Sequence, residues 1–170
     1  MNKKMDFILK ETDYCRILFR FYPKNTHVHG FTDIPPRTWK EVYKVYYSWA
    51  IIYQHVDNGK INSKYNKTLL YFSCDECSEI PNLSGYIKYV IETGVDLKIP
   101  ACGQPAGDWI IQQKKGKDWH GNEYEDYYFE VFDNWMNQGY KFTLSKERAF
   151  DFCDYLDTIN QYALCHSEGI

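Results

Sequence analysis

The chain has no run of about 18 apolar residues, so it lacks a segment that could cross a membrane as a helix. Residues 1–10 include Lys3, Lys4 and Asp6 but no apolar core of the kind that a secretory signal peptide needs. The sequence has no disulfide-like arrangement of cysteines, because its six are scattered: Cys15, Cys74, Cys77, Cys102, Cys153 and Cys165. We therefore expect a cytoplasmic protein with free thiols, in a reducing compartment and without a membrane partner.

The common catalytic and cofactor-binding signatures are missing as well. The sequence contains no Walker loop, no G-x-G-x-x-G, no H-E-x-x-H and no EF-hand loop, and neither G-x-S-x-G nor S-x-x-K. These absences remove the common cofactor classes without excluding an enzyme of another kind. We expect no cofactor, and a protein that is not an enzyme is favoured.

Aromatic residues are abundant in this otherwise ordinary composition. They make up 18% of the 170 residues and include 16 tyrosines, whereas charged residues make up 25%. Tyrosine has a large apolar ring and a hydroxyl that needs a partner, so it suits both half-buried strands and interfaces. The length and the lack of low-complexity linkers predict a single domain over residues 1–170.

Charge is unevenly distributed along the chain. The net charge is −3, but from Asp118 to the C-terminus there are 11 acidic residues and 3 basic ones. No Lys or Arg occurs from Asp118 to Tyr140, where six carboxylates alternate with eight aromatic residues. A negative surface repels nucleic acid and attracts basic proteins.

The hydrophobic pattern predicts three helices. In the first, over residues 38–56, Thr38 and Glu41 form a capping box and Asp57-Asn58-Gly59 provides the stop. The second covers residues 83–93 and ends at Gly94. The third covers residues 146–162, is capped by Ser145, and presents Asp151, Asp154 and Asp157 on its outer side.

Alternating segments predict the strands Cys15–Tyr22, Thr68–Ser73, Trp109–Gln113, Tyr127–Phe132 and Tyr140–Leu144. The last three follow one another without a helix between them, which favours antiparallel pairing. The predicted fold class is therefore α+β: an antiparallel sheet of about 4–5 strands with about three helices packed against it.

Alternation in the strand near residue 130 defines a candidate interaction surface. Tyr127, Phe129 and Val131 should point inward, and Tyr128, Glu130 and Phe132 outward. Aromatic anchors with a carboxylate rim suit docking on a basic protein. The predicted partner-binding residues are Glu123, Glu125, Asp126, Tyr128, Glu130, Phe132, Asp133, Asp151, Asp154 and Asp157.

The favoured function is a small non-enzymatic interaction protein that docks this acidic, Tyr-rich face on a basic partner. A concrete version is an inhibitor that occupies the nucleic-acid groove of a larger enzyme, like the anti-defence proteins of phages and mobile elements. Such a protein would not bind nucleic acid directly.

Two alternatives involve metal chemistry. His27-Val28-His29 places two imidazoles on one side of an extended segment, which could serve a metal-dependent hydrolase or nuclease. Cys74-Asp75-Glu76-Cys77 has the spacing of half a zinc site, but the sequence contains no second C-x-x-C. Without a matched pair of ligands, two thiols at the end of a strand are the favoured interpretation.

Overall fold

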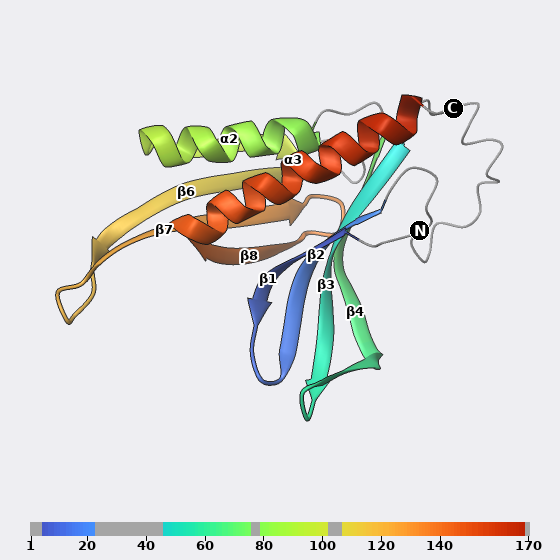
Figure 1. Ribbon diagram of the computed structural model, residues 1–170, viewed down its shortest axis with the longest axis horizontal. Helices are drawn as coiled ribbons and strands as arrows, with labels where there is room; N and C mark the ends of the chain where they lie inside the picture. Colours follow the sequence, from blue (N-terminus) through green and yellow to red (C-terminus); the bar gives the residue numbers. More distant parts are fainter. Residues whose placement is uncertain (1–4, 23–45, 76–78, 102–106, 169–170) are drawn as a thin grey trace. The chain divides into compact units, whose positions relative to one another are not determined.

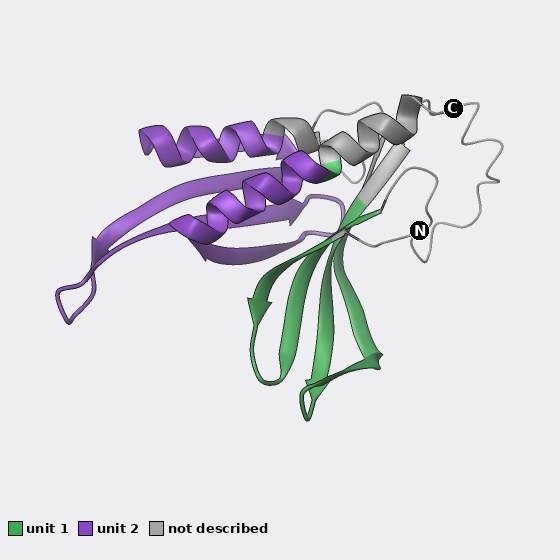
Figure 2. Ribbon diagram, viewed as in Figure 1, with its two compact units in different colours: residues 1–77, 103–105, 159–170 green, residues 78–102, 106–158 purple. Residues whose placement is uncertain are grey.

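Eight strands and two helices are present in the computed structural model, which describes residues 5–22, 46–75, 79–101 and 107–168 (Figure 1). The chain divides into two compact units (Figure 2). Unit 1 comprises residues 1–77, 103–105 and 159–170, and unit 2 comprises residues 78–102 and 106–158. Each unit contains one four-stranded antiparallel sheet.

Unit 1 contains sheet A, in which neighbouring strands are also neighbours in sequence. Its strands, in spatial order, are β1 (Met5–Glu11), β2 (Cys15–Tyr22), β3 (Tyr46–Asp57) and β4 (Lys60–Asp75). On one side, Trp49 stacks between Phe19 and Phe72 at centroid distances of 4.9 and 4.7 Å. On the other side, Leu18, Ala50 and Ile52 form a second buried cluster. Sheet A is therefore apolar on both faces.

This two-sided burial explains why the predicted helix over residues 38–56 is wrong. Residues 46–57 form strand β3, while residues 38–45 lie outside the described residues. Trp49, Ala50, Ile51 and Ile52 are all at most 5% exposed, so the strand has no polar alternation. A continuous apolar run of this kind matches helical spacing by chance, and only its β-branched and aromatic content marks it as a strand.

The helix stop predicted at Asp57-Asn58-Gly59 is also wrong. Asn58 and Gly59 both have positive φ, at 51° and 78°, and they join β3 to β4 as a tight hairpin. Asn-Gly is the preferred pair for such a two-residue hairpin turn, because both central residues must adopt the left-handed region. The sequence signal assigned to a helix stop therefore belongs to a hairpin.

Unit 2 contains sheet B, one whole helix and the first part of a second helix, whose residues 159–168 belong to unit 1. The sheet has the order β5 (Leu97–Ala101), β6 (Gly107–Lys117), β7 (Glu123–Asp133) and β8 (Gln138–Ser145). The helices α2 (Glu79–Thr93) and α3 (Lys146–Glu168) confirm the two predicted helices in this half of the chain. The predicted single sheet with three helices is wrong, because the described strands form two separate sheets and only two helices occur among the described residues.

The helices of unit 2 cover one side of sheet B. Phe152 of α3 packs edge-on against Phe129 of β7 and Phe142 of β8, at 6.0 and 6.2 Å. Two predicted helix ends are confirmed: the Arg148 amide donates to Ser145 Oγ at 3.2 Å, and Gly94, with φ of 73°, donates to the Val90 carbonyl. The other two ends differ, because α2 begins at Glu79 rather than at residue 83 and α3 continues to Glu168 rather than ending at residue 162. Neither helix in the described part of the chain has the length and apolarity that crossing a bilayer requires.

Candidate functional site

The alternation predicted for β7 is confirmed. Tyr127, Phe129 and Val131 are fully buried on the side that the helices cover, whereas Tyr128, Glu130 and Phe132 are partly exposed. We call the side of sheet B opposite α2 and α3 its outward face. Strand β7 therefore divides the predicted partner-binding residues between the two sides of the sheet.

The outward face is charge-balanced rather than acidic. Glu130 lies opposite Lys141 of β8, and Asp126 lies opposite Lys114 of β6. Lys114 Nζ also lies 4.6 Å from the centre of the Tyr128 ring, within reach of a cation–π interaction. The lysines that offset these carboxylates come from neighbouring strands, so the acidic stretch of sequence does not produce an acidic face here.

Glu125 lies on the helix-covered side and joins a network within the fold. Its carboxylate accepts the hydroxyl of Tyr127 and lies 3.3 Å from Lys146 Nζ and 3.8 Å from Lys115 Nζ. Gln113 Nε2 donates to the Tyr127 hydroxyl at 2.7 Å. The hydrogen bond from Tyr127 lowers the pKa of Glu125, and burial, followed by that same bond, raises the pKa of Tyr127 to about 12.

Asp133 has a structural role in the turn between β7 and β8. It is 4% exposed, and its Oδ1 accepts the backbone amides of Trp135 at 2.8 Å and Met136 at 3.0 Å. A buried carboxylate that satisfies two backbone donors is not available to a partner. The turn that it holds leaves Trp135 and Met136 63% and 65% exposed.

The three aspartates of α3 are exposed, as predicted, but two of them are paired. Asp151 Oδ2 is 3.2 Å from Arg148 Nη1, and Asp157 Oδ2 is 3.0 Å from Lys88 Nζ of α2. Asp154 makes no ion pair with any described residue. Because α3 covers the side of sheet B that faces away from Tyr128, Glu130 and Phe132, the structure does not bring the ten predicted residues onto one surface.

Two helices held side by side create a different acidic and aromatic surface. The Ser84 hydroxyl of α2 donates to the Cys153 carbonyl of α3 at 3.5 Å, and Lys88 bridges to Asp157. Burial raises the pKa of the Cys153 thiol to about 11, so at neutral pH this cysteine is a packing residue. We define the helical face as the exposed residues Tyr89, Glu92, Glu147, Phe150, Asp151, Asp154 and Asp157.

Tyr89 and Phe150 were not among the predicted site residues. They are 41% and 43% exposed and lie on the solvent side of α2 and α3. The helical periodicity contained this signal, because both fall outside the apolar stripe that each helix buries. Large apolar side chains among carboxylates on a helix surface are typical of binding sites.

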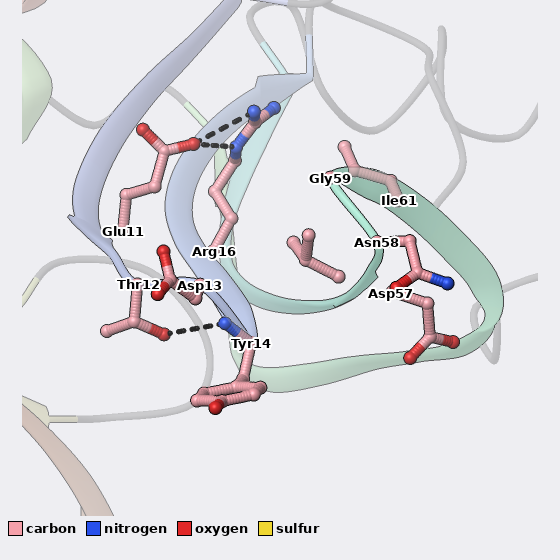
Figure 3. A pocket seen from close by; sticks show the side chains of 10 residues that line it. Glu11, Thr12, Asp13, Tyr14, Arg16, Asp57, Asn58, Gly59 and Ile61 are labelled. Atoms are coloured by element: carbon pink, nitrogen blue, oxygen red, sulfur yellow. Dashed lines mark hydrogen bonds and ion pairs between the residues drawn. The ribbon is translucent and has the colours of Figure 1, made fainter.

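Unit 1 has a pocket of about 710 Å³ between its two hairpin ends (Figure 3). Its residues are Glu11, Thr12, Asp13, Tyr14, Arg16, Val56, Asp57, Asn58, Gly59 and Ile61. Arg16 pairs with Glu11 at 2.9 Å, and Thr12 Oγ1 accepts the Tyr14 amide. The carboxylate of Asp57 is bound by His55 and Asn62 of its own hairpin. Arg16, Glu11 and Asp57 in this pocket are therefore already paired within unit 1.

A hydrogen-bonded series runs along the β3–β4 hairpin. Tyr53 and His55 are joined at 3.3 Å, and His55 Nε2 lies 2.9 Å from Asp57 Oδ1. Asn62 Nδ2 donates to Asp57 Oδ2, and this bond, together with that from His55, lowers the pKa of Asp57. Both ring nitrogens of His55 are thus engaged, which leaves neither free to act on a substrate in this arrangement.

The metal alternatives fall mainly outside the part of the chain that the structure describes. His27, His29 and Cys77 lie there, and Cys74 is placed only as a backbone position in β4, opposite Tyr47. Among the residues that are described, no group of three or more His, Cys, Asp and Glu side chains is arranged to hold a metal ion.

Comparison with known proteins does not identify a family. No family model and no curated protein sequence matches this chain. A solved structure of the plant transcriptional regulator PBF-2 is similar over 96% of this chain and 92% of that chain, with 6% sequence identity and a TM-score of 0.39. A likeness this weak does not bear on function.

Proposed function

We propose that this protein is a non-enzymatic binding protein that docks the helical face of unit 2 on a basic partner protein. The observation that carries the proposal is the exposed line of Asp151, Asp154 and Asp157 on α3, together with the exposed rings of Phe150 on α3 and Tyr89 on α2. An inhibitor that occupies the nucleic-acid site of an enzyme is the specific version that we favour.

The charge of unit 2 supports a basic partner. Its residues include 14 acidic and 8 basic side chains, a net charge of −6, whereas unit 1 has a net charge of +3. On the helical face the carboxylates outnumber Lys88, Lys146 and Arg148, the cations of the same two helices. A surplus of this sign speeds encounter with a positive surface and repels nucleic acid.

The aromatic residues supply what the carboxylates cannot. Exposed ion pairs each contribute little free energy, because both partners are well solvated before binding. Burying Tyr89 and Phe150 would add apolar area and anchor the complex, while the carboxylates would set its orientation. This division of roles is typical of interfaces with apolar centres and polar rims.

A charge reversal tests the proposal. Asp154→Lys should weaken binding to the partner, mainly through a lower association rate, because Asp154 is exposed and has no ion pair among the described residues. Asp13→Lys, at an exposed carboxylate of unit 1, makes the same change of charge and is the matched control. The rates would be measured by surface plasmon resonance with the partner purified from cells of the source organism, after circular dichroism has shown that both variants fold.

If the proposal is right, Asp154→Lys lowers the association rate and Asp13→Lys leaves it unchanged. Equal association rates for Asp154→Lys, Asp13→Lys and the unchanged protein would rule out the helical face as the docking surface. The metal-dependent hydrolase with His27 and His29 remains the alternative, and no described contact favours it.

A further inference from the structure

The most exposed large hydrophobic side chain among the described residues is Trp119, at the end of the β6–β7 hairpin. Its relative exposure is 89%, compared with 63% for Trp135 and 75% for Tyr14. Figure 1 shows that this hairpin extends past the other strands of sheet B. An indole in this position contributes little to the core, so its exposure to water needs another explanation.

The strand register shows that the hairpin end stands apart from the sheet. Pairing of β5 with β6 stops at Leu97 and Ile111, and pairing of β7 with β8 stops at Asp126 and Ser145. Only β6 and β7 continue, through three further residue pairs to Lys117 and Glu123. The turn is therefore presented by two strands alone, beyond the pairing of β7 with β8 that ends where helix α3 begins.

The protruding end is nevertheless well ordered by its own contacts. Asp118 Oδ1 accepts the amides of His120 and Asn122, both at 2.9 Å, and two backbone hydrogen bonds close the loop between residues 118 and 122. The Trp119 ring lies 3.7 Å from the His120 ring, between centroids. A turn fixed in this way presents Trp119 with little conformational entropy left to lose on binding.

A glycine and a tyrosine stiffen the two-stranded part. Tyr124 lies directly opposite Gly116, and its ring covers the glycine so closely that an added Cβ would lie 2.9 Å from the Tyr124 hydroxyl. An aromatic ring across from a glycine compensates for the missing side chain in a strand pair. The hairpin end is thus held in one conformation by its own contacts, although it lies beyond the rest of the sheet.

We infer that Trp119 is an anchor that inserts into an apolar pocket on a protein partner. The inference rests on the proposed function and adds to it the residue that holds the partner. Tryptophan is the residue type most enriched among those that dominate binding energy at protein interfaces. The net charge of −6 on unit 2 favours a pocket with a basic rim.

The same charge argues against the other surfaces on which an indole can rest. Stacking on a nucleobase brings a phosphate backbone close to unit 2, whose net charge has the same sign. The lysines of the hairpin itself do not reverse this sign, because Lys114, Lys115 and Lys117 are outnumbered there by Asp118, Glu123, Glu125 and Asp126. Binding to an anionic bilayer meets the same repulsion, and one interfacial aromatic residue gives weak attachment. A protein pocket is therefore the occupant that fits.

A photo-crosslinking experiment identifies what Trp119 touches. A benzophenone amino acid is placed at position 119 in the full chain and, as a control, at position 135, and both proteins are irradiated in cells of the source organism. We expect one protein adduct from position 119 that is missing from position 135. That protein is then purified for binding measurements with unmodified chains.

The binding measurement decides the inference. Trp119→Ala should raise the Kd for the purified partner about tenfold or more, whereas Trp135→Ala should change it less than about threefold. Both variants should keep the melting temperature of the parent, since both side chains are exposed. Equal binding by Trp119→Ala, or no adduct specific to position 119, overturns the inference.

Two further readouts complete the test. Binding to a single-stranded oligonucleotide, or to vesicles of phosphatidylcholine and phosphatidylglycerol, that is lost in Trp119→Ala would also overturn it. A partner that needs Asp154 but not Trp119 leaves the proposed function intact and removes only the anchor. A partner whose binding needs Trp119 but not Asp154 leaves the anchor intact and removes the helical face as the docking surface.

Discussion

At the scale of single residues, Glu125 shows how a carboxylate in an acidic stretch becomes part of the fold. Its carboxylate accepts a hydrogen bond from the Tyr127 hydroxyl and forms ion pairs with Lys146 and Lys115. These contacts lower the pKa of Glu125 below the usual value of 4.5. A carboxylate with a lowered pKa stabilises the folded state fully above its unfolded pKa. That contribution is lost as the pH falls through the folded pKa.

Glu125→Gln should therefore lower the melting temperature at pH 7 and lose this effect in acid. The difference between the variant and the parent should be constant above about pH 5 and should shrink progressively below the ordinary glutamate pKa. Thermal unfolding followed by circular dichroism from pH 7 to pH 3 measures it. A difference that is the same across this range would mean that the contacts of Glu125 are not electrostatic.

Replacing glycine by alanine should have opposite effects on stability at Gly59 and at Gly85. Gly59 has a φ of 78° with no neighbour within 4 Å of an added Cβ, so Gly59→Ala should cost about 1–2 kcal/mol of backbone strain alone. Gly85, in helix α2, also has nothing within 4 Å, and Gly85→Ala should stabilise by about 0.5–1 kcal/mol. Urea unfolding of both variants tests this. Destabilisation of similar size by both would contradict the backbone assignment.

Single residues were also where sequence reasoning about the site worked in part. The inward and outward sides of β7 followed from strict alternation over Tyr127–Phe132. The cations opposite the carboxylates did not follow, because only the strand register places Lys141 across from Glu130 and Lys114 across from Asp126. Net charge along the chain therefore overstated the negative charge of this face.

At the scale of elements, the aromatic contact of α3 with sheet B is the main link between the helix and the sheet. Phe152 is fully buried and packs edge-on against both Phe129 and Phe142, which stack on each other at 4.8 Å. Phe150, two positions earlier, is 43% exposed on the other side of the same helix. One helix thus has a phenylalanine for packing and a phenylalanine on its surface.

Phe152→Ala should destabilise the protein by about 3–5 kcal/mol, since it removes a buried ring and leaves a cavity. Phe150→Ala should change stability by less than about 0.5 kcal/mol, because the side chain is largely solvated in the folded state. Chemical denaturation of the two variants separates the roles. Similar losses from both would show that α3 is rotated about its axis from the position described.

Elements were predicted well where one face is polar and poorly where both faces are buried. The helices within α2 and α3 and the strands within β2, β4, β6, β7 and β8 followed from the sequence pattern. Strand β3 did not, since burial on both sides removes the period that distinguishes a strand from a helix. Strand β1 and the division into two sheets depend on pairing between segments, which periodicity does not encode.

At the scale of the whole molecule, charge separates along the chain into a unit of +3 and a unit of −6. If the acidic unit steers a basic partner, the association rate should fall about tenfold or more as ionic strength rises from about 0.01 M to about 1 M. The dissociation rate should change less, because the anchoring contacts are apolar. Stopped-flow association kinetics across salt concentrations would check this, and a salt-independent association rate would argue against electrostatic steering.

The order of strands in both sheets also determines how the chain can reach this structure. Every strand in sheets A and B pairs with a strand that directly precedes or follows it in sequence. Such pairing keeps the loops that must close short, and it favours rapid zippering from one hairpin to the next. Sheet A has all four of its strands once Asp75 has left the ribosome, before any strand of sheet B has emerged. Strand β3 can therefore be paired along both of its edges by β2 and β4 within the nascent chain, which shortens the time during which those edges could pair with another chain.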